Sequence, residues 1–98
     1  MHFILTYDIH ASGDRRTRIE ESINQIIKQY SWVKPLTTTF IIQVNGQIEW
    51  NNIQQSLSTL AQNNQGTINY VMTPLMQGGR YDGWLNQDLW NEINERTN

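Results

Sequence analysis

The spacing of apolar and polar positions near the start of the chain predicts a buried strand followed by an amphipathic helix. Residues 2–9 are rich in β-branched and aromatic side chains, and the run stops at polar sequence that contains glycine. A buried strand is usually bounded in this way. Apolar residues then recur at helical spacing from Ile19 to Tyr30. Ser12 or Asp14 is placed to cap this second element, a helix of about four turns.

Residues 32–44 predict a β-hairpin. The threonines and apolar residues of 37–42 favour extended backbone, and Asn45-Gly46 ends the second strand. Pro35 cannot donate a hydrogen bond to a neighbouring strand. We therefore expect the segment from Trp32 to Leu36 at an edge of the sheet, or interrupted by a bulge.

A second helix and a further strand follow the hairpin. Apolar residues at helical spacing within 50–61 predict the helix, with Asn51 as the expected cap and Gln54 placed for a capping box. Residues 67–72 alternate in the manner of a strand. The order strand, helix, strand, strand, helix, strand is typical of the α+β class, a ferredoxin-like βαββαβ sandwich with an antiparallel sheet and both helices on one face.

The end of the chain predicts a short C-terminal helix. Leu85 and the apolar residues up to Ile93 have helical spacing, and Asn86 is a plausible cap. Residues 1–98 are expected to form a single domain, with a core of about 1–75 and a C-terminal appendage of about 76–98.

Both sides of the first strand are largely apolar, which raises the question of what covers the second face of the sheet. Phe3 and Leu5 lie on one side and Ile4 on the other. A sheet that is apolar on both faces in so short a chain predicts a homodimer, in which a second copy supplies the cover. The alternative is that the helix of residues 84–93 folds back and completes the core alone.

Composition restricts the class of function. Acidic residues exceed basic ones by two, so a strong, nonspecific nucleic-acid binder is not expected, and any contact with nucleic acid must be local. The absence of cysteine excludes disulfides, thiolate zinc sites and cysteine nucleophiles. No apolar run approaches the roughly 18 residues of a membrane span, and no leader pattern is present. We expect a cytoplasmic protein without an organic cofactor.

The residues that follow the first strand are the best candidates for chemistry. Asp8 ends the strand, and Arg15, Arg16 and Arg18 come shortly after it. A carboxylate in this position can bind a divalent cation, and arginines can bind phosphate. His10 could act as a general base. Each has an ordinary alternative, since aspartate often caps a turn and surface arginines and histidines are often only solvated.

A second basic position lies near the end of the chain. Arg80 follows Gly78 and Gly79, and this segment is either a flexible basic loop that contacts nucleic acid or a hinge before the last helix.

Together these short motifs resemble the small CRISPR-associated protein two family. The similarity rests on Tyr7-Asp8-Ile9, the arginine-rich helix start, the hairpin strand with Phe40 and the segment Met72-Thr73-Pro74-Leu75. A SinR-like branch of that family is most similar, through Trp32 and a C-terminal Gly-Trp-Leu followed by an acidic, tryptophan-containing helix, here Gly83-Trp84-Leu85 and Asp88-Leu89-Trp90. Virulence-associated protein D, a ribonuclease toxin, is more distantly similar.

The resemblance implies a ferredoxin-like homodimer in which Asp8 of each subunit lies near the two-fold axis. In members that cleave RNA or DNA, this pair of carboxylates is thought to bind Mg²⁺, for which Mn²⁺ can substitute, and to hydrolyse a phosphodiester. Other members bind DNA without needing the aspartate. Two hypotheses therefore stay open: a metal-dependent endonuclease or its inactive descendant, and a noncatalytic dimeric module that binds nucleic acid or protein.

Overall fold

A computed structural model describes residues 1–74 and 83–97 of the chain. The elements in these residues are β1 (His2–Ile9), α1 (Gly13–Ile27), β2 (Ser31–Leu36), β3 (Thr39–Gln43), α2 (Gln47–Asn63), β4 (Ile68–Thr73) and α3 (Gln87–Thr97). This order confirms the α+β class and the ferredoxin-like arrangement with a C-terminal helix. The glycine-containing segment with Arg80 lies outside the described residues.

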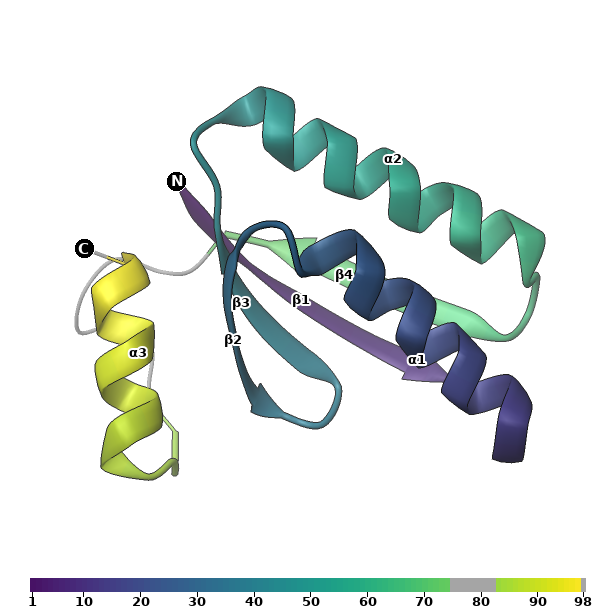
Figure 1. Ribbon diagram of the computed structural model, residues 1–98, viewed down its shortest axis with the longest axis horizontal. Coiled ribbons are helices and arrows are strands. Elements are labelled where there is room, and N and C mark those ends of the chain that lie inside the picture. Colours follow the sequence, from purple (N-terminus) through teal and green to yellow (C-terminus); the bar gives the residue numbers. More distant parts are fainter. Residues whose placement is uncertain (75–82, 98) are drawn as a thin grey trace.

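The strands form an antiparallel sheet in the order β2-β3-β1-β4, and α1 and α2 lie together on one side of it (Figure 1). Strand alternation decides which residues meet these helices. Leu5 pairs with Phe40 on one side and Met72 on the other, and this face carries the main core. Both helices contribute side chains to this core, as do β1, β3, β4 and the residue that follows β3. The buried side chains are Phe3, Leu5, Tyr7, Ile9, Ile19, Ile23, Ile27, Phe40, Ile42, Val44, Ile53, Leu57 and Ile68.

Within residues 1–74 and 83–97, the opposite, outer face of the sheet is covered over β2 and β3 alone. The helix α3 packs there, with Ile93 buried against Val33 and Ile41 and with Ile4 at the edge of the cluster. The C-terminal helix therefore folds back onto the sheet. This was one of the two alternatives that we expected for the covering of the second face. Homodimerisation stays a prediction.

The remaining part of the outer face, over β1 and β4, is open to solvent in the described structure. Five exposed side chains make up this open half: Thr6, Asp8, Asn69, Val71 and Thr73. Two of them, Thr6 and Val71, are direct partners across the two strands, as are Asp8 and Asn69. The open half is mostly uncharged, with one carboxylate at the end of β1.

The hairpin confirms the expectation drawn from Pro35. The strand β2 is at the edge of the sheet, and its register shifts between Val33 and Leu36. The turn that joins β2 to β3 consists of Thr37 and Thr38, two residues that favour extended backbone. The backbone of Tyr7 holds this turn in place, because its N–H donates to the carbonyl oxygen of Thr38.

The expected start of the second helix was wrong. The helix α2 begins at Gln47 after an N-cap at Gly46, so Asn51 lies inside it and accepts a hydrogen bond from the Gln47 side chain. The first turn was missed because Ile48, its apolar residue, is exposed and does not contribute to the buried periodicity. The cap of the C-terminal helix was predicted correctly, since Oδ1 of Asn86 accepts a hydrogen bond from the Leu89 N–H at 2.9 Å. No helix in the described ranges is long and apolar enough to cross a membrane.

Candidate functional site

Asp8 stands on the open half of the outer face, near the end of β1. Its neighbours inside the sheet, Tyr7 and Ile9, point toward the helices and are buried, so strand alternation turns the carboxylate outward. Asp8 makes no hydrogen bond or ion pair with any described residue, and the N-cap position of α1 is occupied by Ser12. The carboxylate therefore does not cap the following helix, and it is free to bind a ligand.

His10 and Asn69 lie next to this carboxylate in the fold. Asn69 is the partner of Asp8 in the β1–β4 register, and its Nδ2 lies 3.2 Å from Nε2 of His10. This contact ties the Asn69 amide to the imidazole ring of His10. The backbone N–H of His10 donates to the Thr67 carbonyl oxygen at 2.7 Å, which holds the loop against β4.

A small open depression lies at Asp8 and Asn69. Its volume is about 150 Å³, and Thr6, Tyr7, Asp8, Asn69, Tyr70 and Val71 line it. Sequence analysis did not identify Asn69, because the only signal that marks it is its register opposite Asp8, and register is not readable from the strand's own sequence.

The three arginines of α1 have different roles. Nη2 of Arg15 donates to Oγ1 of the buried Thr67 at 2.9 Å, and Nη1 of Arg16 donates to the Ile9 carbonyl oxygen at 2.9 Å. These two hydrogen bonds therefore hold the start of α1 against the end of β1 and against Thr67, which directly precedes β4. Arg18 is exposed and has no partner for its guanidinium among the described residues. The structure thus does not bring the three arginines together into one phosphate site.

The oxygen donors around Asp8 suit a hard divalent cation but are few within one chain. The Asp8 carboxylate and the Asn69 amide oxygen are the kind of ligand that Mg²⁺ prefers. The described part of the chain contains no cluster of three or more histidine, cysteine, aspartate or glutamate side chains that could hold a metal ion. A site built on Asp8 would therefore need a carboxylate from a second copy.

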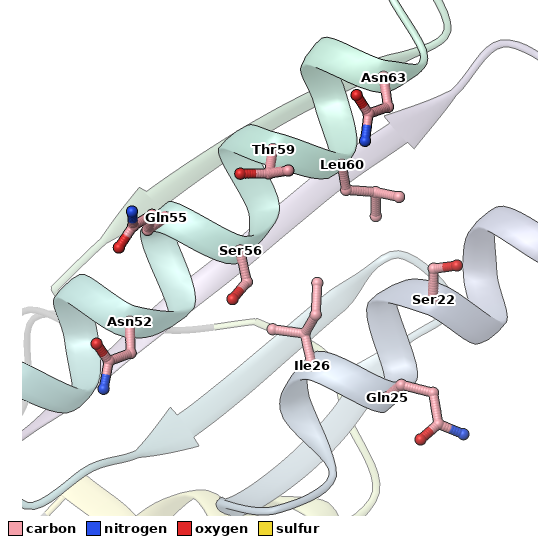
Figure 2. A pocket seen from close by; sticks show the side chains of 9 residues that line it. All are labelled: Ser22, Gln25, Ile26, Asn52, Gln55, Ser56, Thr59, Leu60 and Asn63. Carbon is pink, nitrogen blue, oxygen red and sulfur yellow. The ribbon is translucent and has the colours of Figure 1, made fainter.

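A separate groove lies between α1 and α2, away from Asp8. Its volume is about 700 Å³, and Figure 2 shows Ile26 and Leu60 pointing into the space between the helices. The other residues that line it are uncharged and polar: Ser22, Gln25, Asn52, Gln55, Ser56, Thr59 and Asn63. Because none of the lining side chains is a carboxylate, an imidazole or an amine, this groove offers no catalytic acid or base.

Comparison with known proteins found no family model and no curated protein that matches this chain. The resemblance to the CRISPR-associated protein two family therefore stays a hypothesis. What the geometry adds is the placement of Asp8, His10 and Asn69 together on an open sheet surface.

Proposed function

We propose that two copies of this chain associate through the open half of the outer face and form a metal-dependent endonuclease that hydrolyses RNA or DNA phosphodiesters. The observation that carries the proposal is the exposed, unpartnered carboxylate of Asp8 at the end of β1. In an association whose two-fold axis passes close to the Asp8–Asn69 pair, the two Asp8 side chains would share one site. Such an association would also bury the apolar surface that Val71 leaves in solvent.

The chain's own groups have distinct roles in this proposal. The two Asp8 carboxylates and the Asn69 amide oxygens would hold Mg²⁺, and such an ion supplies a Lewis acid that polarises the phosphate and activates water. Asn69 orients the His10 ring through the 3.2 Å contact. His10 serves as the general base that takes a proton from the attacking water.

The test of catalysis is cleavage of labelled RNA and DNA in the presence of magnesium. Asp8→Asn keeps the size of the side chain and removes its charge, and we expect it to lower the rate about a hundredfold or more. Asp88→Asn is the matched control, because Asp88 is an exposed carboxylate in the first turn of α3 and lies outside the Asp8 depression. Equal cleavage by the wild type and Asp8→Asn would contradict the proposal.

The association is tested separately by sedimentation at micromolar concentration. Val71→Glu places a charge on the open half and is expected to give the monomer mass, whereas Ile48→Glu, at an exposed position of α2, is expected to leave the dimer intact. A wild-type protein that sediments only as a monomer would remove the shared site.

A noncatalytic dimeric module that binds nucleic acid or protein is the second candidate. It is favoured by the net charge of −2 and by the hydrogen bond that ties Arg15 to Thr67, both of which argue for weak affinity for nucleic acid. In that case dimers form, no cleavage depends on Asp8, and Asp8→Asn binds its partner as the wild type does.

A further inference from the structure

A second feature at the same end of the sheet lies between α1 and the β2–β3 hairpin. It is an open hollow of about 860 Å³, lined by Arg16 and Glu20 of α1 and by residues 34–37 of the hairpin. The hydroxyl of Tyr7 donates to the Thr37 carbonyl oxygen at 3.3 Å, which ties the hairpin turn to the end of β1. The hollow therefore lies at the Tyr7 end of the sheet, on the face that the helices cover, whereas Asp8 points to the outer face.

Lys34 supplies a cation to this hollow. Its Nζ lies 4.9 Å from the centre of the Phe40 ring and 5.8 Å from that of Tyr7. Among the described residues, no acidic side chain forms an ion pair with it. The aromatic rings hold the ammonium by cation–π attraction and leave its outer side available for an anion.

Arg16 is a second cation, and its position is set by two contacts. Nη1 donates to the Ile9 carbonyl oxygen at 2.9 Å, and Nη2 lies 3.3 Å from Oε1 of Glu20. A guanidinium has five N–H donors, so these contacts leave others for a phosphate oxygen. Glu20 reduces the positive charge of the hollow but holds the arginine in a fixed direction.

An exposed tryptophan contacts the same phenylalanine ring as Lys34. Trp32 is 42% exposed, and its ring meets the Phe40 ring edge to face, with the centres 5.7 Å apart and an angle of 83°. Trp32 and Lys34 therefore both contact Phe40, and an indole surface lies next to an unpaired ammonium. This is the combination of stacking surface and positive charge with which proteins bind unpaired nucleotides.

We infer that the hairpin-end hollow and Trp32 hold one nucleotide of single-stranded nucleic acid, with its phosphate between Lys34 and Arg16 and its base stacked on the indole. The inference rests on the proposed function, because it names the form of the nucleic-acid substrate. A duplex keeps its bases stacked inside and presents only phosphates, so the indole would have no partner there. An unpaired strand offers both groups at once.

The test is fluorescence anisotropy with short, labelled RNA and DNA single strands and with the duplexes of the same sequences. A chelator removes divalent cations, so that binding is measured without cleavage. Lys34→Gln is compared with Lys28→Gln, which removes the same charge from an exposed residue at the other end of α1. Trp32→Leu is compared with Trp84→Leu, at a tryptophan that is 99% exposed on the segment before α3.

Lys34→Gln is expected to reduce the slope of log affinity against log salt by about 0.7 between about 50 mM and about 200 mM. Trp32→Leu is expected to weaken binding about fivefold or more, while Trp32→Phe, which keeps an aromatic ring, recovers part of this loss. Both control variants bind as the wild type does. Lys34→Arg restores the salt slope, and far-ultraviolet circular dichroism verifies that every variant is folded.

Several results would overturn the inference. One is that neither the RNA nor the DNA single strand binds. Another is that Lys34→Gln and Trp32→Leu bind like their controls. A third is that the duplexes bind as tightly as the single strands and are insensitive to Trp32→Leu. These results are independent of the nuclease proposal, because Asp8→Asn is expected to bind both single strands normally even where it abolishes cleavage.

Discussion

Replacement of Ile93 by alanine tests whether α3 completes the core of this chain from within. Ile93 is 2% exposed and packs against Val33 and Ile41 on the outer face of the sheet. Alanine removes each side-chain carbon beyond Cβ, and at about 0.8 kcal/mol per buried carbon the transfer loss is about 2.4 kcal/mol. The cavity left behind adds to this loss, so we expect the free energy of unfolding to fall by about 3 kcal/mol.

The measurement is urea denaturation followed by tryptophan fluorescence and by circular dichroism, at two protein concentrations. Ile48→Ala is the matched control, because this isoleucine is 77% exposed on α2, and its truncation is expected to change the free energy of unfolding by less than about 0.5 kcal/mol. If Ile93→Ala were no more destabilising than Ile48→Ala, α3 would not be part of the core. The covering of Val33 and Ile41 would then have to come from another molecule.

Two further predictions concern the stability of the fold. Thr67→Val removes the acceptor of the Arg15 hydrogen bond at a position that is 5% exposed, and it should lower the free energy of unfolding by about 1 kcal/mol in urea denaturation. Burial and the neighbouring N-terminal ammonium lower the pKa of His2, so the unfolded chain binds the proton more tightly. Stability should therefore fall as the pH drops below about 6.5, and His2→Gln should flatten that dependence between about pH 7 and about pH 5.

The candidate site was predictable only in part. Asp8 could be found because a carboxylate directly after an apolar strand is a local signal, and strand alternation then determines that it points away from Tyr7 and Ile9. Its relation to Asn69 could not be found, since the two residues are far apart in the chain and meet through the β1–β4 register. The arginines were recognised as a group, but hydrogen bonds to Thr67 and Ile9 give Arg15 and Arg16 roles within the fold.

Local patterns in the sequence determined the elements of this protein and their order. Periodicity of apolar residues is a property of a segment by itself, so it placed β1 and α1 and indicated the edge position of β2 through Pro35. It did not place the turn at Thr37 and Thr38, because neither residue type favours a turn.

Only the tertiary structure decided which surfaces meet. The packing of α3 over β2 and β3 depends on how two segments far apart in the chain fit together, and this choice left Asp8 on the open half of the outer face. The meeting of Lys34 and Arg16 at one hollow, and of Trp32 and Lys34 at the Phe40 ring, is likewise a consequence of packing. The physical reason is that side-chain direction follows from local backbone geometry, whereas proximity requires the long-range contacts that only the folded chain makes.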